Sequence, residues 1–324
     1  MRAEARAAGT TRKRLALATV KRWLGRVFLL LVLLLLVRLA RQVEWAEAGQ
    51  ALRALPARTL WAAAALCVLS HLFYSCYDLI GRHQTSHGLP ATRTATVSFM
   101  SYAFNLNLGA LVGGVAFRYR LYSRLGLRAV TITQVLVLSL LTNWLGYFVL
   151  AGITLLLWPP ALPAGWGLAY AALPLLGGAL LLAAGGYVLA CWLAKGRPWR
   201  WRAYELRPPS GRIALLQLLL ATCSWAVIAG ICWVLLQQRV AYPLVLGALL
   251  TAAVAGVITH VPAGLGVLEA VFVLLLAPYI AQGELLGALL AYRALYYLLP
   301  LLVAASLLLI QGAAKREGRP KPPL

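Results

Sequence analysis

Charged side chains, and acidic ones above all, are scarce in this sequence. Only 8 of its 324 residues are Asp or Glu, and all charged residues together make up 12% of the chain, against about 25% in a typical soluble domain. Hydrophobic residues make up 62%. Because hydrocarbon accepts apolar side chains and excludes formal charge, this composition excludes an ordinary soluble globular domain and indicates a membrane protein.

Catalytic and metal-binding patterns are also missing. The sequence contains no GxSxG elbow, no Walker loop and no HExxH motif, so the usual hydrolase, nucleotide and zinc-protease chemistries have no support. Its five cysteines form no CxxC pair, and no Cys/His spacing suits zinc. We therefore expect no enzyme activity, no catalytic residues, no metal and no cofactor.

Basic residues, by contrast, are plentiful, since 30 Lys and Arg give a formal net charge of +22. A nucleic-acid-binding protein would carry such charge on a soluble module, but the longest polar stretches, 1–26 and 195–212, are too short to fold alone. The charge instead fits membrane topology and attraction to anionic lipid head groups. We expect no nucleic-acid partner, and we expect membrane phospholipids, anionic ones, as partners.

The N-terminal 26 residues are rich in Arg and Lys and precede the apolar run Val27–Val37. Arg38 and Arg41 follow this run, where a signal peptide would have a small-residue cleavage site. We therefore expect an uncleaved first helix after a basic cytoplasmic tail, 1–26, and a second basic cytoplasmic tail at 313–324. The chain would be a multi-pass protein of the bacterial inner (cytoplasmic) membrane with both termini in the cytoplasm.

Eight apolar segments follow one another along the chain. A helix needs about 20 apolar residues to cross the roughly 30 Å hydrocarbon core, and we interpret six segments as plain spanning helices. The other two are interrupted: 95–117 by amide and glycine residues, and 244–278, which is too long for one span, by a break near its middle. The eight segments are 24–40, 59–80, 95–117, 129–158, 168–194, 213–237, 244–278 and 285–312.

The basic residues between the segments predict the side of the membrane on which each connection lies. Connections 118–128 and 195–212 are rich in Arg, whereas 159–167 and 278–284 contain no Lys or Arg. The positive-inside rule places the first two in the cytoplasm and the last two outside. Connection 38–58 fits less well, because it is assigned outside and yet contains several Arg.

Counting the crossings then predicts two re-entrant hairpins. Segment 95–117 must enter and leave at the cytoplasmic face, and 244–278 must do the same at the outer face. The expected fold is an all-α polytopic membrane protein with about six spanning helices and two hairpins, in two inverted halves, 27–158 and 159–312. Interrupted segments at corresponding positions of two halves are typical of transporter binding sites. The alternative is that both interruptions are kinks in ordinary spanning helices.

The two interruptions supply most of the candidate binding residues. Broken backbone at membrane depth must be buried in protein or line a wet cavity, because its free N–H and C=O groups have no lipid partner. Amide side chains can supply partners, glycine lets the backbone turn or approach closely, and a half-helix that starts at a break points its positive end at a phosphate. The candidates are Asn105, Asn107, Gly109, Gly113 and Gly114 in the first hairpin, and His260, Pro262, Gly264 and Gly266 in the second.

Few ionisable residues lie deep in the apolar segments. Glu269 follows the second break, and Arg293 lies in the last segment with Tyr297 one turn further on. We expect a Glu269–Arg293 ion pair, since neither charge is stable alone in hydrocarbon. The pair is either a structural link or a site that handles head groups or protons. His71 and Asp78 belong to a polar stripe, and Asp78 lies close enough to the cytoplasmic interface to be either solvated or functional.

Five runs of residues are distinctive: 102–109, 113–126, 142–147 with Asn143 in it, 260–270 and 291–297. Together they resemble the YbhN-like inner-membrane proteins, which are similar to the transmembrane flippase domain of bacterial lysylphosphatidylglycerol synthases. The resemblance covers roughly residues 20–312, and the Pro-x-Gly-x-Gly-x-x-Glu run is its most specific part. It implies that the protein moves lipid between leaflets.

The sequence therefore predicts a transporter or flippase-like protein for an anionic phospholipid. Arg118, Arg120 and Arg124 would attract head groups at the cytoplasmic mouth, and the glycine-rich breaks would hold the phosphate. The synthases of the family carry a soluble aminoacyl-transferase domain after the membrane part, whereas this chain ends at Leu324. We therefore expect no synthase activity, and a lysyl-lipid substrate is not implied.

Two other functions stay open. A membrane-embedded enzyme or accessory subunit acting on lipid-linked sugars would need two acidic residues that converge at one face. A non-transporting membrane scaffold would have a dry, apolar centre. A homo-oligomer and a further partner in lipid or envelope biogenesis are also left open.

Overall fold

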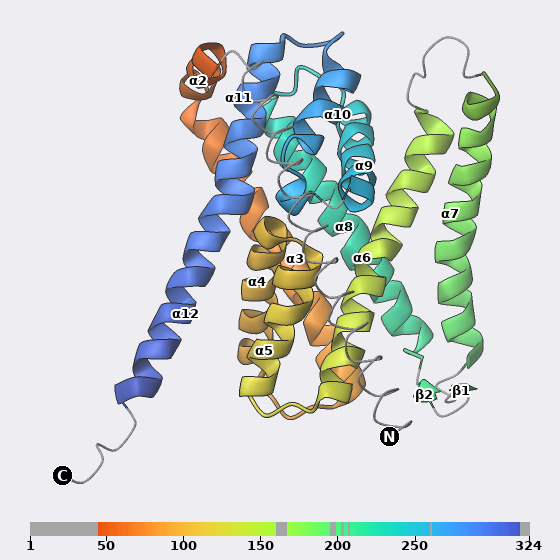
Figure 1. The fold of residues 1–324 in the computed structure, drawn as a ribbon. Helices are drawn as coiled ribbons and strands as arrows, with labels where there is room; N and C mark the ends of the chain where they lie inside the picture. Colours follow the sequence, from red (N-terminus) through yellow and green to blue (C-terminus); the bar gives the residue numbers. More distant parts are fainter. Residues whose placement is uncertain are drawn as a thin grey trace, which may run out of the picture. The chain divides into compact units, whose positions relative to one another are not determined.

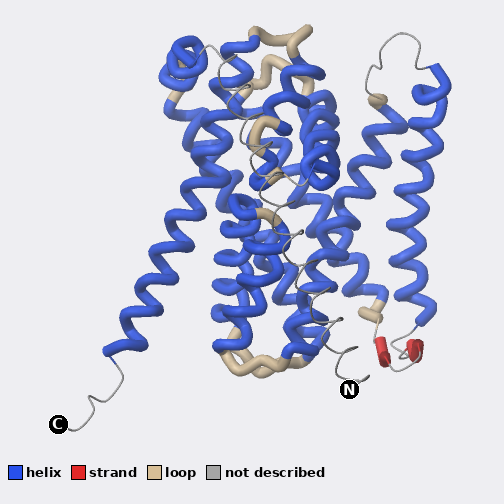
Figure 2. The backbone as a smooth tube through the Cα atoms, viewed as in Figure 1, coloured by secondary structure: helices blue, strands red, loops and turns tan. Residues whose placement is uncertain are grey.

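The computed structural model describes residues 45–159, 167–194, 199–201, 204–206, 208–259 and 261–317. The predicted N-terminal tail, the first predicted span and the end of the C-terminal tail lie outside these residues. The described residues form, from Ala46 onwards, a single unit. Helices make up nearly all of it (Figures 1 and 2). The predicted all-α class is thus confirmed, with one short antiparallel strand pair as an addition.

The elements keep the order of the predicted segments. In chain order they are α2 (Trp45–Arg53), α3 (Ala57–Thr85), α4 (Ala91–Leu108), the π-helix η1 (Ala110–Ala116), α5 (Phe117–Arg124), α6 (Ala129–Leu157), α7 (Gly167–Ala194), β1 (Trp199–Trp201), β2 (Tyr204–Leu206), α8 (Gly211–Leu235), α9 (Tyr242–Thr259), the 3₁₀-helix η2 (Pro262–Gly264), α10 (Val267–Leu276), α11 (Gln282–Tyr292), the π-helix η3 (Arg293–Leu298) and α12 (Leu299–Glu317).

Six helical stretches are long and apolar enough to cross a membrane: α3, α6, α7, α8, α9 and the continuous run from α11 into α12. Helix α7 shows how such a stretch meets lipid, because its Leu175 and Leu182 are 77% and 78% exposed. The chain is therefore a multi-pass membrane protein. Five of the six stretches match predicted spans, whereas α9 is the predicted first leg of the second hairpin.

The first interruption produces a reversal of the backbone. Helix α4 ends at Leu108, and Gly109 follows with a φ of +82°, a left-handed value that favours glycine. The chain then turns back, so that η1 and α5 pack against α4 (Figure 1). A Cβ at Gly113 would lie 2.2 Å from the Phe104 carbonyl oxygen, and a Cβ at Gly114 would lie 2.9 Å from the Asn105 side-chain oxygen. These two glycines therefore permit the close approach of the two legs.

The second interruption reverses the chain between α9 and α10, which pack against each other. Three residues have left-handed backbone: Ala263 with a φ of 58°, Gly264 with 56° and Gly266 with 75°. A Cβ at Gly264 would meet no atom within 4 Å. Gly264 is thus needed for its left-handed backbone conformation. It is not needed for close packing, since there is room for a side chain at this position.

The two reversals lie next to each other inside the unit. Helix α4 contacts both η2 and η3, so the end of the first hairpin meets the break of the second. In Figure 1 the α4–α5 hairpin and the α9–α10 hairpin extend from this contact toward opposite ends of the bundle. Both backbone reversals agree with the predicted hairpins, whereas re-entry into a bilayer and the inverted relation of the halves stay predictions.

Cysteine labelling tests the first hairpin directly. Thr92 and Ser123 are exposed near its two ends, and native Cys223 is exposed and would be replaced by serine. We expect Thr92→Cys and Ser123→Cys to be protected from an impermeant maleimide in intact spheroplasts and to react after permeabilisation. Labelling of only one of them from outside would mean that the segment crosses the membrane.

Packing around α3 holds the two hairpins in place. Helix α3 lies against α4, α6 and α8, and α6 lies against α7 and α8. One buried cluster joins α3, α8, α9, α10 and α11, and a smaller one joins the first hairpin to α6 and α12. Residue 146 shows how close the central helices come, because a Cβ on Gly146 would lie 2.3 Å from the Ala221 carbonyl carbon.

Candidate functional site

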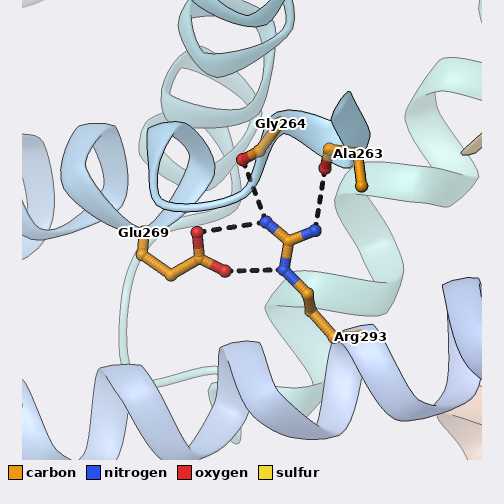
Figure 3. A network of polar contacts seen from close by, with 4 residues as sticks. All are labelled: Ala263, Gly264, Glu269 and Arg293. Carbon is orange, nitrogen blue, oxygen red and sulfur yellow. Dashed lines mark hydrogen bonds and ion pairs between the residues drawn. The ribbon is translucent and has the colours of Figure 1, made fainter. Parts of the chain in front are cut away.

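The second hairpin is held by Arg293, which lies where α11 passes into η3. Its Nε and Nη2 donate to the two carboxylate oxygens of Glu269 at 2.6 and 3.0 Å (Figure 3). Its Nη1 donates to the Ala263 carbonyl at 2.8 Å, and Nη2 also donates to the Gly264 carbonyl at 3.0 Å. The predicted Glu269–Arg293 pair is confirmed, and the break itself turns out to be part of the same network.

The local sequence explains why one arginine binds both the Glu269 carboxylate and the two carbonyls of the break. The left-handed turn at 263–264 removes two carbonyls from the helical hydrogen-bond pattern, and a buried carbonyl needs a donor. Glu269 lies in the first turn of α10. A guanidinium is a planar fork of five N–H donors, so it can meet a carboxylate and two carbonyls at once. The side chains of Arg293 and Glu269 are 12% and 22% exposed, so the pair is mostly withdrawn from solvent.

The break in the first hairpin is bonded to the last helix. The side-chain nitrogen of Asn107 donates to the Ala103 carbonyl at 2.8 Å and to the Tyr297 carbonyl at 3.0 Å. The ring of Tyr297 lies 5.0 Å from the Arg293 guanidinium, within the range of a cation–π contact. Residues of both predicted breaks therefore meet at η3. The side chain of Asn105 lies beside Gly114 and forms no such bridge in the described part of the chain.

Asn143 is placed differently from the residues at the breaks. It lies on α6, and its main-chain carbonyl accepts a hydrogen bond from the Trp225 indole N–H at 3.0 Å. This contact joins α6 to α8 through the main chain of Asn143 and does not involve its side chain. His260 lies outside the described residues, and the side chain of Pro262 is not described either.

A second ion pair joins the first hairpin to α3 and corrects two expectations. Arg118, on α5, is 1% exposed and Asp78, on α3, is 0% exposed. Arg118 Nε lies 3.5 Å from Asp78 Oδ2, and the Tyr122 hydroxyl donates to that same oxygen at 2.7 Å. Arg118 is therefore not at an exposed mouth, and Asp78 is not solvated. The reason is that this face of α5 packs toward α3 and α6, where Arg118 Nη1 donates to Ser139 at 3.2 Å.

The remaining two arginines of the predicted mouth are exposed. Arg120 and Arg124 lie on the same short helix as Arg118 and face outward. An outward-facing guanidinium near a bilayer surface attracts anionic head groups with about 1 kcal/mol per charge. Helix α5 thus carries one buried arginine and two exposed ones.

A cluster of hydroxyl and aromatic side chains fills the space between α3, α4 and η3. The Tyr296 hydroxyl lies 2.9 Å from Ser70 Oγ and 2.8 Å from the Tyr102 hydroxyl, and the Tyr102 ring is stacked on Tyr74 at 3.6 Å. His71 packs among these rings, with Nδ1 2.8 Å from a main-chain carbonyl. Sequence reasoning found the α3 stripe but not its partners, since Tyr102 and Tyr296 are distant in sequence and look like ordinary membrane aromatics.

The described residues offer little for metal or redox chemistry. Within them, no three His, Cys, Asp or Glu side chains gather into a metal-binding group. The five cysteines are free thiols, three of them buried. The polar chemistry inside this part of the chain therefore rests on the two arginine–carboxylate pairs that are withdrawn from solvent, and on the hydroxyl groups near them.

The fold and this site define a class: a multi-pass helical membrane protein with two broken hairpins, each tied to a neighbouring helix by an arginine–carboxylate pair. The model of the lysylphosphatidylglycerol synthase TM region matches residues 23–304, and the chain belongs to this family as one of its YbhN-like members. It is 45% identical over 298 residues to the inner membrane protein YbhN of Escherichia coli, covering 91% of this chain and 94% of that protein. It is also 35% identical over 241 residues to an uncharacterized protein of Synechocystis sp., covering 73% and 74%.

Proposed function

We propose that this protein moves an anionic phospholipid between the leaflets of the bacterial inner membrane, with both chain termini in the cytoplasm. The observation that carries the proposal is the meeting of two broken hairpins, each tied to a neighbouring helix by an arginine–carboxylate pair that is largely withdrawn from solvent. Broken backbone at membrane depth is tolerated only where protein or a wet cavity satisfies it. Such breaks are typical of transporter sites.

The side chains favour a phosphate over a sugar or a metal cation. Arginine forms the strongest and most directional bonds with phosphate oxygens, and the first hairpin carries three arginines on one short helix. Exposed Arg120 and Arg124 would collect head groups, and the sites with desolvated guanidinium would select them. The sequence has no nucleotide-binding motif, so an ion gradient or passive exchange would drive the movement.

An enzyme that acts on lipid-linked sugars is the weaker hypothesis. It would need two carboxyl groups that converge on one substrate. Asp78, on α3, and Glu269, on α10 of the second hairpin, instead belong to different parts of the fold, and each is already paired with an arginine. We therefore propose a role without catalysis, and the same polar centre argues against a scaffold with a dry, apolar core.

The test is leaflet exchange in reconstituted liposomes. Purified protein would be placed in vesicles that contain fluorescent phosphatidylglycerol, and dithionite would quench the label on the outer leaflet. We expect quenching to proceed well beyond half of the label, and faster with phosphatidylglycerol than with phosphatidylcholine. Exchange no faster than in protein-free vesicles, with several anionic lipids and with an imposed proton gradient, would refute the transport function.

A further inference from the structure

The two largely buried arginine–carboxylate pairs differ in the distance between the charged groups and in the number of their hydrogen bonds. In the second hairpin, Arg293 and Glu269 share two short hydrogen bonds, and the guanidinium also meets two carbonyls. In the first hairpin, Arg118 and Asp78 share one contact of 3.5 Å. Asp78 Oδ1 and Arg118 Nε have no hydrogen-bond partner among the described residues. The more deeply buried pair is thus the less well satisfied one.

A buried ion pair of poor geometry is costly. Removing two charges from water costs several kcal/mol per ion, and only close contact with additional hydrogen bonds offsets it. The Glu269–Arg293 pair meets both parts of that condition, whereas the Asp78–Arg118 pair has hydrogen bonds to Tyr122 and Ser139 but no close contact between the two charges. The surroundings compensate only in part: the Tyr122 hydroxyl donates to Asp78 Oδ2 and the hydroxyls of Ser98 and Ser139 lie near the carboxylate, whereas Asp78 Oδ1 has no hydrogen-bond partner among the described residues.

The groups around Asp78 are few. The charged or titratable ones are Arg118 and Tyr122 from α5, and His87 from the loop that precedes α4. Tyr74 of α3 lies under the Arg118 guanidinium at 5.7 Å. Arg118 is thus the one described cation paired with Asp78, and Asp78 is the one described carboxylate paired with Arg118.

We propose that Asp78 occupies Arg118 in place of the phosphate of an anionic phospholipid, and that the two exchange. When Asp78 takes up a proton from water, Arg118 loses its counter-ion and becomes free to bind the phosphate diester. When the phosphate leaves, Asp78 releases the proton and pairs with Arg118 again. The only covalent bond that changes is the O–H bond, which Asp78 forms when it takes the proton from hydronium and breaks when it returns the proton to water, and the buried charge is balanced in both states. This inference rests on the proposed lipid transport and names its head-group site.

The exchange couples protons to lipid for an electrostatic reason. Protonation alone would leave a buried, unpaired guanidinium, and phosphate binding alone would put two anions beside one cation; each state is unfavourable. The two events therefore favour each other, and the coupling is reciprocal. One proton would accompany each singly charged head group, so the step carries no net charge. Because Arg118 lies on the second leg of the hairpin, its release would also remove one of the two polar contacts between α5 and Asp78 of α3, and the Tyr122 hydrogen bond would remain.

The experiment measures thermal stability and lipid retention of the whole protein in detergent. Asp78→Asn keeps the shape and the Tyr122 hydrogen bond but leaves Arg118 unpaired, so phosphatidylglycerol should raise its melting temperature by several degrees more than that of the wild type. The double variant Asp78→Asn with Arg118→Gln has neither charge and should lose this rescue. Arg93→Gln, which removes an exposed cation of the same hairpin, is the matched control and should behave as wild type. Phosphatidylcholine and inorganic phosphate are the comparison additives.

Retention at two pH values gives a second readout that does not need the single variant Asp78→Asn to be stable. The wild type should retain several-fold more phosphatidylglycerol at pH 5 than at pH 8, and the double variant should show no such difference. Burial and nearby Arg82 lower the pKa of His87, so His87→Gln is included; loss of the pH effect in that variant would overturn the assignment to Asp78. Equal rescue of the single and double Asp78 variants, or equal rescue by phosphatidylcholine or inorganic phosphate, would also overturn it.

These outcomes are separable from those of the liposome assay. Rescue through Arg118 without leaflet exchange would leave the lipid site standing and refute transport. Exchange without rescue would leave transport standing and refute the exchange at Asp78.

Discussion

Replacing Arg293 by alanine is expected to destabilise the protein by about 3–5 kcal/mol, the range for breaking a buried pair by removing one partner. The change leaves the Glu269 carboxylate desolvated and also removes the donor for the Ala263 and Gly264 carbonyls. Glu269→Ala should cost less, because Arg293 keeps both carbonyl acceptors. The free energy of unfolding in mixed detergent would be measured for both single variants and for the double variant.

Two further variants make the result specific. Arg293→Lys should recover only a small part of the loss, since one ammonium group cannot meet four acceptors in the geometry of a planar fork. Arg239→Ala breaks the exposed pair with Glu284, whose side chains are 51% and 45% exposed, and should cost at most about 1 kcal/mol. Strict additivity of Glu269→Ala and Arg293→Ala would mean that the two side chains do not interact.

The sequence was sufficient to predict this pair but not the other one. Glu269 and Arg293 are isolated charges in long apolar segments, so each needs a partner and few are available. Arg118 is different, because it begins a basic run that also contains the exposed Arg120 and Arg124. Which of the three turns inward depends on the rotation of α5 against α3 and α6, and that rotation is decided by packing with residues far away in the sequence.

In the fold, too, some features could be predicted from the sequence and others could not. The positions of both breaks could be predicted, since each combines several glycine, proline or amide residues within one short stretch of an apolar run. The π-helices η1 and η3 could not be predicted from the sequence, because an extra residue in a helical turn leaves no pattern in composition or charge. The contact of α4 with η2 and η3 could not be predicted from the sequence either, since it joins segments from the two halves of the chain.

Gly113 is the position at which a single methyl group should do the most damage to the first hairpin. In Gly113→Ala the added Cβ would lie 2.2 Å from the Phe104 carbonyl oxygen and 2.4 Å from the Asn105 main-chain nitrogen. Both atoms belong to the backbone of α4, so no side-chain rotation relieves the clash and the two legs must separate. We expect a loss of about 3 kcal/mol, the upper part of the range for overpacking.

Gly185→Ala is the matched control, because it lies in helix α7, is exposed and would meet no atom within 4 Å. It should be neutral or stabilising by up to about 1 kcal/mol, the usual gain from removing an exposed helical glycine. Thermal unfolding in detergent, together with limited proteolysis between α4 and α5, would compare the two variants. Proteolysis is informative because separated legs expose backbone that the packed hairpin protects. If Gly113→Ala unfolded at the same temperature as Gly185→Ala and resisted protease equally, η1 would not rest on α4, and the closed hairpin on which the Asp78–Arg118 contact depends would be wrong.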